Sequence, residues 1–358
     1  MIQYGAPPAE DEIEVTVFGP GYGEAIAVHL GDHNWMLVDS CIDPHSRGPA
    51  SLSYLKSIDV APENVRVIVA SHWHDDHVRG ISDIARACPG AEFQISGVFN
   101  NKESLAFLAA YGGGFLPALT SGTKELYAVL SERESIFQLQ ERAGIFDYAR
   151  NGHRISVCAI SPLQSAKDLC IANLAQHLPE AGAPITKVVP LRPNHESVAI
   201  HIDFGQDGGV LLGSDLEDHP SYGWTAIAEN GNWWRLRPKA SAYKVAHHGS
   251  ASGDSPVIWT ALLQTDSYAA LTPFNQGRHA LPTDRDKERL KSCTRHAYSA
   301  SGASRKAQLD PHALRRIGTI TGARPVRPVN NGFGAVRLRK RFGEASWRVE
   351  IFGDACAL

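Results

Sequence analysis

Short apolar runs alternate with glycine-rich turns along the first hundred residues, a pattern typical of strands. We expect strands over residues 13–18, 24–30, 34–39 and 65–70. Two segments instead space their apolar residues three or four apart, which predicts helices. These segments are residues 51–58, where Leu52 and Leu55 share a face, and residues 81–88.

The pattern returns to strands in the second half of the chain. We expect strands at residues 155–160, 197–204, 209–214, 242–247, 334–340 and 346–352, and helices at 256–263 and 284–293. The stretch between the halves, about residues 100–150, reads as an inserted helical lobe or lid. Strands in both halves with helices between them predict one α/β domain over residues 1–358, with two sheets face to face and helices outside.

Charge is distributed unevenly along the chain. The 358 residues include 43% apolar residues, enough for a sizeable core, and the net charge is only -3. Residues 305–348, however, hold eleven Lys and Arg against two Asp and Glu. Such a basic segment could meet a polyanion, or it could be a solvated face that balances an acidic surface.

The six cysteines have no paired spacing such as CxxC, so we expect reduced thiols in a cytosolic protein. The N-terminus lacks the basic start and apolar run of a signal peptide. Apolar runs stay shorter than a membrane span needs. We therefore expect a cytoplasmic location and no membrane partner, and the sequence leaves the oligomeric state open.

The sequence SHWHDDHVRG, residues 71–80, directly follows an apolar strand. His72 and His74 are two apart, so in extended backbone they point the same way, while Asp76 and His77 follow where the chain turns. Imidazole nitrogen and carboxylate oxygen suit zinc, and also manganese or iron. The spacing predicts that two histidines hold one metal while the Asp-His pair faces a second.

Two later strands also end in candidate ligands. Asp215 follows the apolar strand 210–212, and His247 and His248 follow residues 244–246. A carboxylate at a strand end can bridge two metals, and a histidine can close the second site. We assign Asp215 and His247 to the metals and expect Lys244 to belong to the strand.

Residues 72–77 match HxHxDH, the signature of the metallo-β-lactamase fold, and the sequence resembles that family. Asp39 matches the family's first-strand aspartate, and Asp215 and His247 match its later ligands. The resemblance implies an αββα sandwich, α/β in class, with two divalent metal ions along one edge of the sheets. Zinc is the expected metal and manganese the alternative.

A closer resemblance is to the metallo-β-lactamase-like domain of the ComEC/Rec2 competence proteins. It is carried by the turn GPGYG, by the Asn194–Ser197 segment NHES, by Asp215 and by HHGS at residues 247–250. Two departures weaken it: Ser214 stands inside the usual Gly-Asp, and residues 280–281 split the usual His-Pro. The third histidine of the first metal stays open between His195, Asn194 and water.

Two metals in such a site would activate water for hydrolysis. Asp76 is placed to orient that water, and His248 could protonate the leaving group, bind an oxyanion or only pack behind the ligands. Candidate substrate contacts are Ser250, Asn275 and His279.

The favoured function is a phosphodiesterase or nuclease acting on nucleic acid or a nucleotide. Alternation in the strand 334–340 puts Arg337 and Arg339 on one face, where they could track a phosphate backbone. One alternative is a lactone or ester hydrolase, whose pocket would be lined by Phe99, Phe107, Phe115 and Leu116. Another is a non-catalytic partner subunit.

Overall fold

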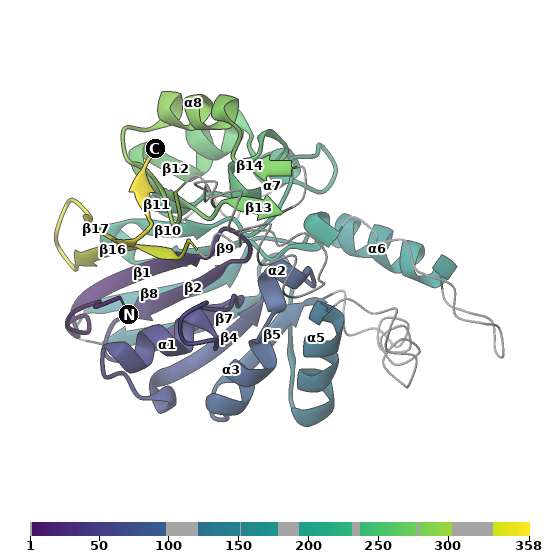
Figure 1. Ribbon diagram of the computed structural model, residues 1–358. Coiled ribbons are helices and arrows are strands. Elements are labelled where there is room, and N and C mark those ends of the chain that lie inside the picture. The colour runs from purple at the N-terminus through teal and green to yellow at the C-terminus, as the bar shows by residue number, and fades with distance from the viewer. Residues whose placement is uncertain are drawn as a thin grey trace, which may run out of the picture.

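The computed structural model describes residues 2–97, 121–150, 152–177, 193–230, 237–276, 279–302 and 332–358. Two eight-stranded sheets form the centre of the fold (Figure 1). The first sheet has the order β17 (Arg348–Gly353), β16 (Gly334–Arg341), β1 (Glu12–Gly19), β2 (Ala25–Leu30), β3 (Trp35–Val38), β4 (Val65–Ala70), β5 (Glu92–Ser96), β6 (Phe137–Leu139). The second has the order β18 (Cys356–Ala357), β15 (Ala297–Ser299), β12 (Leu263–Leu271), β11 (Ala240–Lys244), β10 (Gly209–Leu212), β9 (Ile200–Asp203), β8 (His153–Ala159), β7 (Gly144–Arg150). A hairpin of β13 (Phe274–Gln276) and β14 (His279–Leu281) stands apart.

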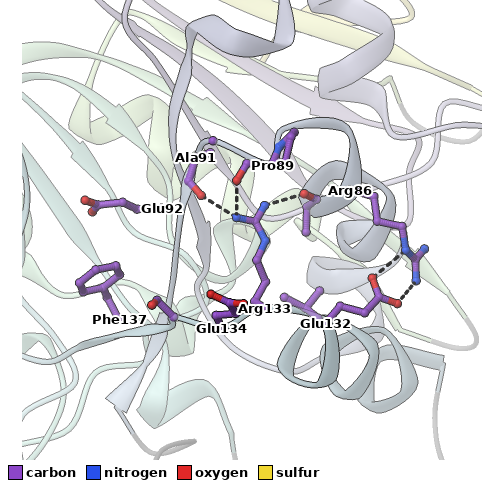
Figure 2. A pocket seen from close by; sticks show the side chains of 12 residues that line it. Arg86, Pro89, Ala91, Glu92, Glu132, Arg133, Glu134 and Phe137 are labelled. Atoms are coloured by element: carbon purple, nitrogen blue, oxygen red, sulfur yellow. Dashed lines mark hydrogen bonds and ion pairs between the residues drawn. The ribbon is translucent and has the colours of Figure 1, made fainter.

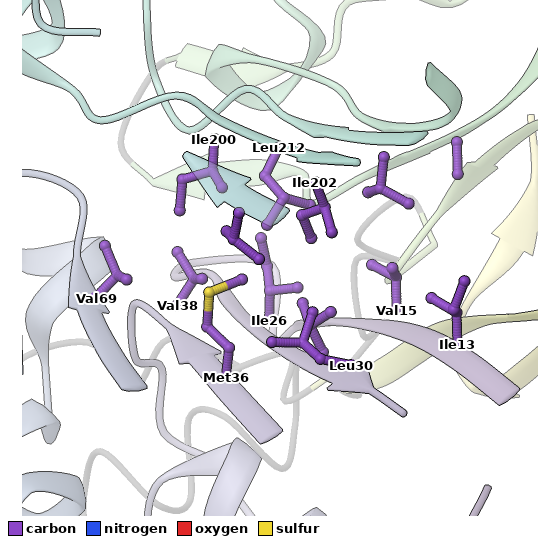
Figure 3. Packing of buried hydrophobic residues seen from close by; sticks show 14 of the residues in the cluster. Ile13, Val15, Ile26, Leu30, Met36, Val38, Val69, Ile200, Ile202 and Leu212 are labelled. Atoms are coloured by element: carbon purple, nitrogen blue, oxygen red, sulfur yellow. The ribbon is translucent and has the colours of Figure 1, made fainter. Parts of the chain in front are cut away.

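Aliphatic side chains from both sheets fill the space between them (Figure 3). Val15, Ile26 and Met36 of the first sheet share one buried cluster with Ile202 and Leu212 of the second. Alternate residues of a strand point to opposite faces, so every second position faces this cluster. Complete burial of one such side chain stabilises the fold by about 2 kcal/mol.

Helices cover the outer face of each sheet (Figure 1). The first sheet is covered by α1 (Ala50–Ser57), α3 (Ile81–Ala87) and α5 (Ser121–Glu132). The second is covered by α7 (Trp224–Asn230), α8 (Asp284–Cys293) and the π-helical turn Ile258–Leu262. Within the described ranges, the remaining helices are α2 (Asp75–Val78), α6 (Gln164–His177) and the 3-10 turns Pro62–Asn64, Pro193–Glu196, Gly205–Asp207, His247–Gly249 and Ala251–Gly253. The predicted αββα layering is confirmed.

Arg133, just after α5, fastens this helix to the end of α3 (Figure 2). Its guanidinium donates to the carbonyl oxygens of Ala85, Cys88, Pro89 and Ala91, at 2.5 to 3.1 Å. The last carbonyls of a helix have no partner within the helix, and Arg133 supplies a donor to those of Ala85 and the cap residue Cys88, as well as to two carbonyls just beyond the helix.

The described part of the expected helical insertion is only partly helical. α5 lies in it, but Phe137–Leu139 and Gly144–Arg150 are strands of the two sheets. β7 is rich in β-branched and aromatic residues and pairs with β8, so strand pairing prevails there. The residues expected to line an apolar pocket lie outside the described residues; they are Phe99, Phe107, Phe115 and Leu116.

Arg337 and Arg339 do share one strand face, but that face is covered by α1 and the N-terminal segment. Arg337 is 2% exposed and donates to Glu350 and to the Tyr54 hydroxyl. Arg339 is 6% exposed and donates to Glu14 at 2.6 Å. The expectation that these two arginines track a phosphate backbone is therefore wrong, because both guanidinium groups are buried and engaged in ion pairs. The basic residues from 305 to 327 lie outside the described part of the chain.

No helix in the described ranges combines the length and the apolar character that a membrane crossing requires.

The two sheets bring their parallel strands to one edge. β3 and β4 are parallel in the first sheet, and β10, β11 and β12 are parallel in the second. The residues that follow the carboxyl ends of these strands build the candidate site.

Candidate metal centre

Asp39 is the buried anchor of the site at the end of β3. Its carboxylate accepts hydrogen bonds from the backbone N–H and the hydroxyl of Ser71, both at 2.7 Å. The Asp39 Oδ2 also lies 2.8 Å from Nδ1 of His77. Asp39 has a φ of +58°, a left-handed conformation that aspartate tolerates better than most residues. It therefore fixes the His77 ring with Nε2 pointing away from Asp39.

Four buried side chains meet where His77 points. The Nε2 of His77 lies 3.3 Å from Oδ1 of Asp215. The Nε2 of His248 lies 3.2 Å from Oδ2 of Asp76 and 3.5 Å from Oδ2 of Asp215. Ligand atoms of these four residues all lie within 4.8 Å of one another. We call Asp76, His77, Asp215 and His248 the first group.

A second group shares Asp215 with the first. It consists of His72, His74 and Asp215, again with ligand atoms within 4.8 Å. The Nε2 of His72 lies 3.2 Å from Nδ1 of His74, and His74 is partly open to solvent. The shared carboxylate fits the bridging role that the sequence predicts for Asp215.

Buried charge controls the pKa values of the first group. Burial would lower the pKa of His77, but the carboxylates of Asp215, Asp39 and Asp76 outweigh it and raise the pKa well above its usual value. Burial is outweighed in the same way at His248, where Asp215 and Asp76 raise the pKa to about 10. Burial would raise the pKa of Asp215, but His248 and His77 hold it well below its usual range. Attraction between these imidazole rings and the carboxylates therefore sets the direction of all three pKa shifts.

The second group has the opposite protonation. Burial lowers the pKa of His72 well below its usual value, helped by the neighbouring His77 and His74. Burial also lowers the pKa of His74. Both rings are therefore neutral near pH 7, the form that binds a metal.

The groups meet the requirements of divalent metals in two respects. Imidazole nitrogen and carboxylate oxygen are ligands for zinc and manganese. In addition, Nε2 of His77 and Oδ1 of Asp215 are buried, form no hydrogen bond and face each other at 3.3 Å as an ion pair. A divalent cation would take the place of the His77 proton in this pair, since metal-binding histidines are neutral.

The two neighbouring histidines lie differently from what the sequence led us to expect. His248, for which an acid, an oxyanion-binding and a packing role were all open, lies in the first group, and its Nδ1 is 3.0 Å from the carbonyl oxygen of Thr272. His247, expected as a metal ligand, lies outside both groups and contacts Ser252 at 2.9 Å and Glu217 at 3.3 Å. Both histidines have positive φ, so the turn directs their side chains to different sides.

The candidates for a third histidine lie beside the groups. His195 packs against the Tyr222 ring at 4.5 Å between ring centroids and faces Glu217 at 4.0 Å. The Nδ2 of Asn194 lies 3.2 Å from Nε2 of His247, and its Oδ1 is buried without a hydrogen-bond partner. Asn194 thus offers a free acceptor next to the site, whereas His195 belongs to a separate ring cluster.

The three expected substrate contacts are placed as follows. Ser250 accepts a hydrogen bond from the backbone of Ser252 and so caps a turn. Asn275 is exposed on β13, and its backbone N–H donates to Gly21. His279 opens β14, and its side chain lies outside the described part of the structure.

Sequence reasoning missed the residues that support the ligands. Ser71 and Ser214, joined hydroxyl to hydroxyl at 2.7 Å, connect the ends of β4 and β10. Glu24 and Lys244 are fully buried behind the site. Charged residues in otherwise apolar strands were the available signal, since such residues are almost never fully buried unless paired.

Comparison with known proteins gives a partial match. The sequence model of the Metallo-beta-lactamase superfamily matches residues 18–99, which include Asp39 and residues 72–77. No curated protein matches the sequence.

Similar solved structures include a putative metallo-beta-lactamase from Thermotoga maritima, with 12% identity, 54% of this chain and 68% of that chain covered, and a TM-score of 0.31. MEM-A1, a subclass B3 metallo-beta-lactamase from a soil metagenome library, has 13% identity, covers 68% and 82%, and has a TM-score of 0.34. The metallo-beta-lactamase SMB-1, in complex with mercaptoacetic acid, has 12% identity, covers 71% and 84%, and has a TM-score of 0.36. At these values the structures carry no argument about what this chain acts on.

Proposed function

We propose that this protein is a metal-dependent hydrolase. The observation that carries the proposal is the pair of buried Asp-His groups that share Asp215 at the carboxyl ends of parallel strands from both sheets. His72, His74 and Asp215 would hold one divalent ion, and Asp76, His77, Asp215 and His248 the other. Bound there, the ions would supply Lewis-acid chemistry to a water and to the bond being cleaved.

The side chains around the groups hold the ligands in place for this chemistry. Asp39 binds Nδ1 of His77, and the Thr272 carbonyl accepts from Nδ1 of His248, so both rings present Nε2 to the site. Such outer contacts fix the tautomer and the orientation of metal-binding histidines.

His247 is left for proton transfer. Its side chain is 18% exposed, and its Nδ1 is bound by Ser252. The Nε2 atom therefore faces Asn194 at the border of the site, where it accepts a hydrogen bond from the amide Nδ2. We infer that this nitrogen, which has a lone pair and no proton in this arrangement, takes up a proton during the reaction. Proton transfer was one of the roles that the sequence left open for His248.

For the substrate we propose a phosphodiester of nucleotide size. Two observations support this choice: the resemblance to the ComEC/Rec2 domain, and two half-buried aromatic rings beside His248. Phe274 lies 5.3 Å from the His248 ring and 5.5 Å from Tyr22, between ring centroids. Aromatic rings at such a place can stack on a base. The buried Arg337 and Arg339 give no support to a long nucleic-acid track.

The test is a substrate panel on zinc- and manganese-loaded protein. We expect turnover of bis(p-nitrophenyl) phosphate and of cyclic or linear dinucleotides, and loss of turnover in Asp76→Asn. Asp75→Asn is the matched control, because Asp75 is adjacent but belongs to neither group. Hydrolysis of lactones or carboxylic esters alone would replace the phosphodiester proposal with the small-molecule hydrolase. No turnover of any class by fully metal-loaded protein would favour the non-catalytic partner.

A further inference from the structure

A buried ion pair connects the two sheets directly behind the metal groups. Glu24 immediately precedes β2 of the first sheet, and Lys244 is the last residue of β11 in the second. Their side chains form an ion pair, and both are fully buried. Burying two charges costs more than their attraction returns in many proteins, and apolar residues of similar volume often replace such a pair without loss of stability. The pair therefore calls for an explanation other than stability.

Each member of the pair touches a residue next to a metal-site residue. The Lys244 ammonium donates to the carbonyl oxygen of Ser214, which precedes Asp215, at 3.1 Å. Thr272 donates its hydroxyl to Glu24 at 2.6 Å, and the carbonyl oxygen of Thr272 lies 3.0 Å from Nδ1 of His248.

Glu24 also reaches the helix that carries Asp76. Its backbone N–H donates to the carbonyl oxygen of Asp76 at 2.8 Å. Its carboxylate lies within 4.8 Å of the ligand atoms of Asp39 and His77, and its Oε1 has no hydrogen-bond partner. The pair thus adjoins all four members of the first group, and Lys244 supplies a fixed positive charge behind their carboxylates.

We propose that Glu24 and Lys244 are positioning residues that hold Asp215, His248 and Asp76 in the arrangement that binds the metal ion of the first group. This proposal rests on the proposed function. The pair connects β2 to the ends of β10, β11 and β12, so the two halves of the site keep one relative position. Removing the pair would leave the ligands present but less well aligned.

The test is a double-mutant cycle with Lys244→Met, Glu24→Gln and the double variant. Zinc affinity is measured by isothermal titration calorimetry, and the melting temperature is measured on metal-free protein. Each single variant leaves one buried charge unpaired, so we expect a lower melting temperature. The double variant leaves none, so its melting temperature should return toward wild type. Its affinity for the zinc ion of the first group should stay about 10- to 100-fold weaker than that of the wild type, which is the usual effect of losing an outer contact of a metal ligand.

Lys340→Met is the control, because Lys340 is also buried and donates to a backbone carbonyl, that of Asp207. It pairs with Ile13, at the opposite end of β1 from the site. Zinc affinity should not change in this variant. Thr272→Val removes one hydroxyl and leaves the buried charges unchanged. It should lower the affinity for the zinc ion of the first group, and it provides the test if the double variant does not fold.

Wild-type zinc affinity in the double variant, or in Thr272→Val if the double variant is unfolded, would overturn the positioning role while leaving the proposed function intact. Absence of zinc binding in the wild type would overturn the proposed function, and the positioning role with it.

Discussion

Asp76 shows most clearly, at the scale of single residues, how chemistry and folding separate in this protein. It contacts His248 beyond the end of a strand, so its replacement leaves no apolar cavity. We expect Asp76→Asn to lose at least about 100-fold in turnover, because loss of an outer partner of a metal ligand already costs about 10- to 100-fold and Asp76 would itself be a ligand. Its melting temperature should change by less than about 5 °C. Unfolding of Asp76→Asn, or an equal activity loss in the control Asp75→Asn, would contradict this assignment.

The titration of His29, a residue away from the metal site, should make the stability of the protein depend on pH. It is buried in β2, its Nδ1–H donates to the carbonyl oxygen of Glu12, and burial lowers its pKa from 6.5 to about 4. Above pH 6.5 the His29 ring is neutral in both the folded and the unfolded state, and burying it makes its full contribution to the unfolding free energy. As the pH falls from 6.5 toward 4, the unfolded state binds the proton first, and stability falls by up to about 3 kcal/mol.

Urea unfolding at pH 7 and pH 5 measures this effect. Wild type should lose more unfolding free energy between the two values than His29→Gln, which has no titrating ring. Equal losses in both proteins would show that His29 does not titrate as described.

Replacing Arg339 should change stability rather than substrate binding. Its guanidinium is paired with the fully buried Glu14, so Arg339→Gln leaves a buried carboxylate with the Thr16 and Tyr54 hydroxyls but without its charged partner. We expect the unfolding free energy to fall by about 3 kcal/mol or more. The control Arg341→Gln removes an exposed arginine 3.6 Å from Glu12 and should cost less than about 1 kcal/mol. A similar small effect of both changes in urea unfolding would mean that the buried pair adds nothing.

At the scale of elements, we expect Arg133 to stabilise the contact between two helices. Its four carbonyl contacts join α5 to the end of α3 (Figure 2). Arg133→Met keeps the aliphatic stem but removes the shared donor of these carbonyls, of which that of Cys88 keeps the Ala91 N–H. We therefore expect a loss of about 2 kcal/mol. Arg86→Met, which removes an exposed pair with Glu132, is the control and should destabilise the protein much less than Arg133→Met. Hydrogen exchange should quicken at the end of α3 only in Arg133→Met; unchanged exchange would contradict the fastening role.

The sequence predicts most strands but not their neighbours. β1 to β4 and β8 to β11 fall where apolar runs predict them, because a strand buried on both faces needs a nearly continuous apolar run. β16 and β17 fall where alternation of apolar and polar residues predicts them. β12 mixes polar and apolar residues and was missed, although it forms the centre of the parallel part of the second sheet. The pairing of β16 with β1 depends on residues more than 300 positions apart, which no local pattern contains.

The same holds for the site: local sequence predicts some of its residues, but not those that only the fold brings together. The ligands in residues 72–77 could be predicted because their spacing alone brings them together. The choice between His247 and His248 could not, because it depends on two consecutive residues with positive φ. Glu24 and Lys244 could not be assigned either, since only the stacking of the two sheets brings them into contact.

At the scale of the whole molecule, the centre is assembled from two halves. The first sheet provides His72, His74, Asp76 and His77, and the second provides Asp215 and His248. The family match at residues 18–99 covers only the first half. Metal binding should therefore require both sheets in their native arrangement, as the shared Asp215 implies.

The most direct test of this account is metal quantification on protein purified without chelator and reloaded with zinc. We expect two zinc ions per chain in wild type and in Asp75→Asn. Asp215→Asn should hold fewer than one, because it removes the carboxylate that both groups share, while its circular dichroism stays like that of the wild type. A folded wild-type protein that holds no zinc or manganese, or that hydrolyses its substrate at full rate after the metals are removed, would contradict the account.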